Sequence, residues 1–153
     1  MTPAAPTNAG SVLAFDFGTR RIGVAVGNTL VRIAHPLSTI AAEANVTRFA
    51  AIASLIGAWR PVLLVVGRPL HADGSAHAMT TRSERFARQL EGRFGLPVAR
   101  VDERYTTLDA DAALARAGVR AKERKAVRDA AAAQLILQSW FDDESRNGAR
   151  GPA

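Results

Sequence analysis

Four acidic residues, far apart in the chain, lie where carboxylates could do chemistry. Asp16 ends the apolar run "VLAF", Asp102 and Glu103 end "LPVARV", and Asp129 lies early in an alanine-rich helical segment. The carboxyl ends of parallel strands meet at one edge of a sheet, so the strand-end acids should converge there. The helix would add Asp129. Side-chain alternation along a strand does not decide between Asp102 and Glu103, which face opposite ways.

Three carboxylates at one sheet edge would repel each other unless a cation joins them. Two such charges about 4 Å apart cost on the order of 4 kcal/mol at an effective dielectric near 20. All-oxygen ligands suit Mg²⁺ or Mn²⁺, and the chain has no cysteine to favour softer metals. Two such ions, about 3.5–4 Å apart, can activate a water and stabilise the leaving oxygen in phosphodiester cleavage. The acids therefore predict a centre for Mg²⁺ or Mn²⁺, with two ions.

Each acid also has a simpler interpretation. Asp16 could be a turn residue, Glu103 a surface charge, and Asp129 a charge that stabilises a helix N-terminus. "DFGT" is also similar to the first phosphate loop of actin-like ATPases. Those proteins hold nucleotide between two lobes, and 153 residues provide only one. The metal interpretation therefore depends on the acids occurring together.

A hairpin should carry Asp16. The β-rich runs "SVLAFDF" and "RIGVAVG" are separated by residues 18–21, a short glycine-containing turn that favours antiparallel pairing. "VRIAHPLSTI" could continue the meander, with Pro36 at an edge or bulge because proline donates no ladder hydrogen bond.

The rest of the chain predicts helices alternating with strands. Residues 62–67, "VLLVVG", are apolar without alternation, as in a parallel strand covered on both faces. Helices are expected before this strand, with Trp59 in the core, and after it, ending at Gly95. A strand over 98–102, a short helix and a last helix from about Lys122 to Phe141 follow. The order predicts an α/β fold with a mixed five-stranded sheet, a meander plus parallel βαβ crossovers, flanked by helices.

Length and composition predict one domain. We expect the domain over residues 11–141, with disordered tails at 1–10 and 142–153. Hydrophobic residues make up 48% of the chain, as in a globular protein. No segment is typical of a signal peptide or a membrane span, so a cytoplasmic location without membrane contact is expected.

Basic residues surround the acids and predict a polyanionic partner. The formal net charge is +6, which favours nucleic acid, although a solvated basic surface is the alternative. Phosphate contacts are expected from residues in the hairpin turn, in the loop after residue 67, beside Glu103 and before Asp129. These are Arg20, Arg21, Arg68, Arg104, Lys125 and Arg128.

Four segments, in order and covering most of the chain, resemble the YqgF family. They are "AFDFGTRRIGVAVGN", "LLVVGRPLHADGS", "VDERYTT" and "RDAAAAQLILQSW". These are Holliday-junction-resolvase-like proteins with an RNase H-like fold, described as pre-16S rRNA nucleases. The resemblance implies an acidic trio of Asp16, Glu103 and Asp129, and so selects Glu103 over Asp102. Arg68 and Tyr105 stand where family members often have leucine, and neither change removes a ligand.

The resemblance implies a hydrolase that cleaves phosphodiester bonds in structured RNA, at the pre-16S rRNA end during ribosome biogenesis. A resolvase acting on branched DNA and a non-catalytic nucleic-acid-binding module are the alternatives. The chain is expected to act as a monomer or a weak homodimer.

Overall fold

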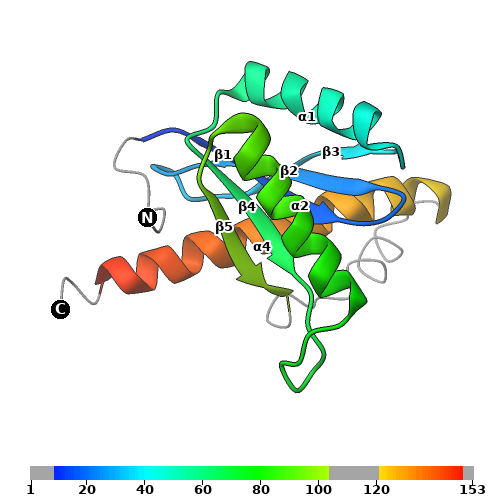
Figure 1. The fold of residues 1–153 in the computed structure, drawn as a ribbon. Coiled ribbons are helices and arrows are strands. Elements are labelled where there is room, and N and C mark those ends of the chain that lie inside the picture. Colours follow the sequence, from blue (N-terminus) through cyan, green and yellow to red (C-terminus); the bar gives the residue numbers. More distant parts are fainter. Residues whose placement is uncertain (1–8, 104–120, 150–153) are drawn as a thin grey trace.

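Five strands form one mixed sheet in the order β3-β2-β1-β4-β5 (Figure 1). The computed structural model describes residues 9–103 and 121–149, with side chains placed in the last helix only for 127–145. The first three strands form an antiparallel meander, and β4 and β5 run parallel to β1. Their bounds are β1 Ser11–Phe17, β2 Ile22–Asn28, β3 His35–Ile40, β4 Leu63–Arg68 and β5 Val98–Asp102. The expected mixed five-stranded sheet is confirmed.

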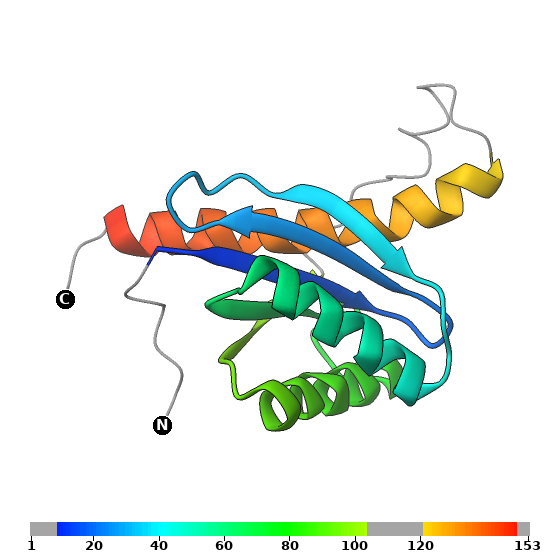
Figure 2. The same cartoon turned by 90° about the horizontal axis from the view of Figure 1, so that it is seen from above.

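Helices cover both faces of the sheet (Figure 2). The helices α1, Asn45–Trp59, and α2, Ala78–Phe94, lie on one face, and α4, Ala121–Ala149, crosses the other. The side chains of β1 alternate between the two resulting cores. Leu13 and Phe15 belong to the cluster under α1 and α2, whereas Val12 and Ala14 belong to the cluster under α4. Burial on both faces explains why β1 and β4 are apolar without polar alternation.

Pro36 and Gly95 occupy the positions expected from the sequence. Pro36 lies in the edge strand β3 and pairs with Ala25, beside the register shift between Val24 and Ala25. An edge position with a bulge tolerates the missing N–H of proline. Gly95 ends α2 with φ 63°, the left-handed conformation that glycine adopts most readily.

The expected C-terminal tail is wrong at its start, because α4 continues through Ala149 instead of ending at Phe141. The polar stretch after Phe141 had the composition of a tail. However, Asp142 accepts a hydrogen bond from Gln138, one turn earlier, and Ser145 accepts one from Arg32 at 2.8 Å. The contact with Arg32 joins the end of α4 to the loop between β2 and β3, and composition does not report such a tertiary contact.

The position of Trp59 differs from the one expected from the sequence. Trp59 was expected in the core but is 40% exposed, at the last residue of α1, where the chain turns away at Arg60 with φ 46°. The short helix expected after residue 105 lies outside the described residues. Among the helices that the structure describes, none has the length and apolar character needed to cross a bilayer.

Candidate active site

Asp16 and Glu103 meet at the carboxyl edge of the parallel strands. Phe15 is in register with Val66, and Arg68 with Asp102, so Asp16 lies beside Gly67 and Glu103 follows directly after β5. The two carboxyl groups hydrogen-bond to each other. The structure thus brings together two of the three predicted acids, which lie 87 positions apart in the sequence.

Gly67 leaves room for the contact between Asp16 and Glu103. A Cβ at position 67 would collide with Oε1 of Glu103 and would lie 2.5 Å from Cδ1 of Ile136. Glycine therefore leaves the space over β4 through which the Glu103 side chain reaches Asp16.

Burial makes both acids weak, and the charge of a neighbouring acid adds to this effect at each. Burial, the charge of Asp16, their shared hydrogen bond and the charge of Asp102 raise the pKa of Glu103 to about 8. Burial also raises the pKa of Asp16, with a further contribution from the charge of Asp129 against the lowering effect of the Glu103 hydrogen bond. Near neutral pH the pair therefore shares a proton, which a divalent cation could replace.

This pair predicts an unusual pH dependence of stability. Glu103 has an ordinary pKa of 4.5 and a raised value in the folded chain, so the folded state binds its proton more tightly. Its stabilising contribution is complete below pH 4.5 and is lost as the pH rises through about 8. Without divalent ions, we expect the free energy of unfolding to fall between pH 5 and 8.5, by a few kcal/mol in order of magnitude.

Glu103→Gln should flatten this dependence and should be more stable than the wild type above pH 8. Urea titrations at several pH values measure both effects. Glu43→Gln, at a well-exposed glutamate, is the matched control and should keep the wild-type profile. An unchanged profile in Glu103→Gln would show that this carboxyl group does not cause the pH dependence.

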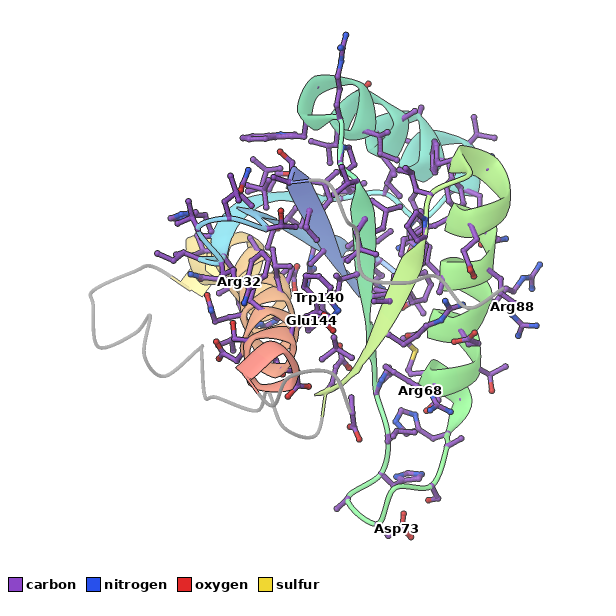
Figure 3. The ribbon with its side chains drawn as sticks, turned by 90° about the vertical axis from the view of Figure 1, so that its left-hand side faces the viewer. Arg32, Arg68, Asp73, Arg88, Trp140 and Glu144 are labelled. Carbon is purple, nitrogen blue, oxygen red and sulfur yellow. The ribbon has the colours of Figure 1, made fainter. Side chains whose placement is uncertain are left out.

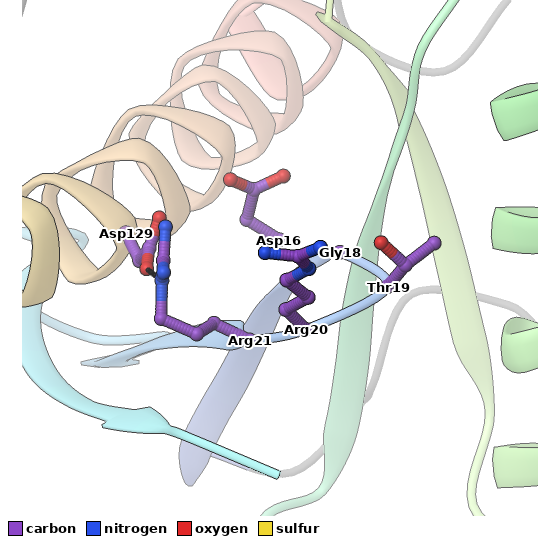
Figure 4. A pocket seen from close by; sticks show the side chains of 6 residues that line it. All are labelled: Asp16, Gly18, Thr19, Arg20, Arg21 and Asp129. Atoms are coloured by element: carbon purple, nitrogen blue, oxygen red, sulfur yellow. Dashed lines mark hydrogen bonds and ion pairs between the residues drawn. The ribbon is translucent and has the colours of Figure 1, made fainter. Parts of the chain in front are cut away.

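Asp129 lies on α4, across a pocket from Asp16 (Figure 4). Its Oδ2 is 2.5 Å from Nε of Arg21, and the two side chains are 18% and 33% exposed. The pocket has a volume of about 230 Å³ and is lined by Asp16, Gly18, Thr19, Arg20, Arg21 and Asp129. The helix comes this close because position 23 on β2 is glycine, and a Cβ there would collide with the backbone carbonyl of Asp129.

The three acids do not form a single ligand cluster. Within the part of the chain that the structure describes, no three acidic or histidine side chains lie close enough together to hold one ion. Asp129 is near enough for its charge to raise the pKa of Asp16, but its own partner is Arg21. The donor chemistry fits a hard divalent cation at Asp16 and Glu103, and Asp129 could join it only by leaving Arg21.

The predicted phosphate contacts differ in their surroundings. Arg20 and Arg21 line the pocket, and Nε of Arg20 is 3.8 Å from Oε1 of Glu43. Arg68 is exposed at the end of β4, and Arg128 precedes Asp129 on α4. Arg104 lies outside the described residues, as does the side chain of Lys125. The phosphate-binding role of all six stays a prediction.

Arg48 was not predicted from the sequence, but it stabilises the turn beside Asp16. Its side chain is buried in the first turn of α1 and donates to the carbonyl oxygens of Ala42 at 2.5 Å and Gly18 at 2.6 Å. Its guanidinium group also lies 5.3 Å from the ring centroid of Phe17. These contacts fix the turn that presents Arg20 and Arg21. Helical spacing could have identified this residue in the sequence. Arg48 lies four residues before the buried Ile52, on the helix face that packs inward.

Comparison with known proteins covers nearly the whole chain. The family model described as "RuvX: Holliday junction resolvase" matches residues 10–143. A protein of Dechloromonas aromatica is 56% identical over 133 residues, which are 87% of this chain and 91% of the relative. A protein of Methylobacillus flagellatus is 54% identical over 142 residues, 93% of this chain and 97% of the relative. Both relatives carry the name "Putative pre-16S rRNA nuclease".

Among solved structures, this chain is similar to Thermus thermophilus RuvC in complex with a Holliday junction substrate. The TM-score is 0.55 at 17% identity, and the match covers 89% of this chain and 96% of RuvC. At this identity the likeness shows the fold, which is that of an RNase H-like resolvase, as expected from the sequence.

Proposed function

Because the chain belongs to the RuvX (YqgF) family of nucleases, we propose that it cleaves structured RNA with the help of divalent ions, at the end of the pre-16S rRNA. Family membership confirms the sequence-based expectations of the family and of a hydrolase acting on phosphodiester bonds. The metal dependence, the acidic trio and the processing step are the proposal. We place the activity in the cytoplasm, where bacterial ribosomal RNA is processed.

The observation that carries the proposal is the partly buried Asp16–Glu103 pair with Asp129 across an arginine-lined pocket. Asp16, Glu103 and Asp129 would hold Mg²⁺ or Mn²⁺, which when bound would supply the Lewis acidity that activates water and stabilises the leaving oxygen. Arg20 and Arg21 lie on the same pocket and would hold the phosphate groups beside the cleaved bond. Arg48 would keep their turn in place through its hydrogen bond to Gly18.

The names of the relatives favour RNA as the substrate, because both refer to the 16S rRNA precursor. Branched DNA is the second candidate, since the RuvC structure of the same fold contains a Holliday junction. A binding module without catalysis is a weaker candidate, because the acids of all three motifs are intact in this chain.

A cleavage assay tests the proposal. The purified chain is incubated with a labelled RNA that contains the precursor end of 16S rRNA, or with a four-way DNA junction. We expect cleavage in Mg²⁺ or Mn²⁺, at least tenfold faster for the RNA than for the junction, and none in excess chelator. Cleavage in chelator would contradict the metal dependence, and a preference for the junction would contradict the substrate. RNA binding with no cleavage in any ion would favour the binding module.

A further inference from the structure

The outward face of α2 carries a stripe of arginines that the proposed cleavage site does not use. Arg82, Arg85 and Arg88 recur every three residues, and all three side chains are exposed. Residues with this spacing lie along one side of a helix. The opposite side contains the buried Phe86, Ala87 and Leu90, which pack against the sheet. The three arginines therefore point away from the core, as Figure 3 shows for Arg88.

No acidic side chain forms an ion pair with these three arginines within the described part of the chain. Both glutamates of α2 form ion pairs with Arg100 on β5. Nη2 of Arg100 lies 2.9 Å from Oε1 of Glu84 and 2.8 Å from Oε1 of Glu91. This pairing directs the negative charges of α2 toward the sheet. The outward face keeps its positive charges and attracts anions.

The arginine stripe begins beside the carboxyl edge of the sheet. The hydroxyl group of Thr80, in the first turn of α2, donates a hydrogen bond to the carbonyl oxygen of Pro69. Pro69 follows Arg68, the exposed last residue of β4, and Gly67 packs against Glu103. Short contacts therefore connect the acidic pair to the start of α2. From there the stripe extends about 9 Å along the helix axis, from Arg82 to Arg88.

We propose that Arg82, Arg85 and Arg88 bind the phosphate backbone of an RNA arm that extends from the cleaved bond. This inference rests on the proposed function and adds a second contact surface to it. An unneutralised row of guanidinium groups fits the repeated phosphates of a nucleic acid strand. None of the exposed large apolar residues identified in the described part of the chain lies on α2, so this face lacks the apolar anchors of a typical protein interface. Such contacts position the substrate and do not read its sequence.

Binding measurements test this surface. The variants R82Q/R85Q/R88Q and, separately, R85Q and R88Q are made in an Asp16→Asn background, so that the RNA stays uncleaved. Affinities are measured by fluorescence anisotropy at several salt concentrations. One RNA has a long duplex arm, and the other covers only the cleavage site. R60Q, which removes one exposed arginine at the end of α1, is the control for each single variant.

The triple variant should bind the long RNA roughly tenfold or more weakly near 0.1 M salt. The slope of log K against log salt should become shallower by roughly two to three, because each lost phosphate contact removes about 0.7–0.9. Each single variant should remove about one third of this change, and R60Q none. The loss should be at least fivefold smaller on the short RNA.

Two results would overturn the proposal: unchanged affinity and salt slope for the long RNA, or equal losses on both RNAs, which would indicate a general effect of net charge. Thermal unfolding checks that the triple variant folds, and the single variants keep the test decisive if it does not. Failure of the nuclease proposal is distinguishable, because it would appear as absence of cleavage by the chain without substitutions.

Discussion

Asp16→Asn should abolish RNA cleavage while leaving the chain folded. We expect kcat to fall by on the order of 10³-fold, since a divalent ion supplies several kcal/mol of charge stabilisation in the transition state. Asparagine keeps the shape of the side chain but removes the negative charge that would hold the ion. A single-turnover assay with the labelled precursor RNA in Mg²⁺ or Mn²⁺ measures the loss.

The fold should tolerate this substitution. Partial burial raises the pKa of Asp16, so its ionised form costs stability in the folded chain. An asparagine amide can donate to Glu103 in place of the shared proton. Asp142→Asn, at an exposed aspartate on α4, is the control and should keep full activity. If Asp16→Asn retained more than a tenth of the wild-type rate, Asp16 would not be a metal ligand.

Gly23→Ala should be the most damaging single-methyl change in the described part of the site. The added Cβ would overlap the carbonyl oxygen of Asp129 and lie 3.1 Å from the backbone nitrogen of Ala130. Neither backbone atom can swing aside as a flexible side chain could, so α4 would have to move off β2. Overpacking of this kind typically costs 1–3 kcal/mol, and with backbone atoms of two residues in the way we expect a loss of at least about 3 kcal/mol.

The same movement would carry Asp129 away from Asp16, so activity should fall even where the variant stays folded. Denaturant unfolding and the cleavage assay measure the two effects. Gly57→Ala is the matched control. Gly57 lies inside α1 with no atom within 4 Å of an added Cβ, and alanine there should stabilise the helix by about 0.5–1 kcal/mol. A melting temperature of Gly23→Ala within 2 °C of the wild type would contradict the close approach of α4.

Local patterns in the sequence were enough to predict the sheet, its hairpin turn and bulge, and the end of α2. The hairpin turn at 18–21, the bulge at Pro36 and the cap at Gly95 each follow from residues adjacent in the chain. Converging strand ends also brought Asp16 and Glu103 to one edge, although alternation alone did not choose Glu103 over Asp102.

The remaining features depend on residues far apart in the chain. Arg21 was predicted as a phosphate contact, but its present partner is Asp129, 108 positions away. The extension of α4 beyond Phe141 likewise depends on Arg32 reaching Ser145. No local pattern contains such pairings, because they arise only when α4 docks on the meander.

The position of α4 has a consequence for incomplete chains. This helix covers the cluster of Val12, Ala14, Ala25 and Val65 and also brings Asp129 to the pocket. Synthesis proceeds from the N-terminus, so every strand leaves the ribosome before the helix that covers it. A chain terminated prematurely before α4 would expose one whole apolar face of the sheet and would lack the third carboxylate. Such a fragment would be prone to aggregation and proteolysis and would never be a partly active nuclease.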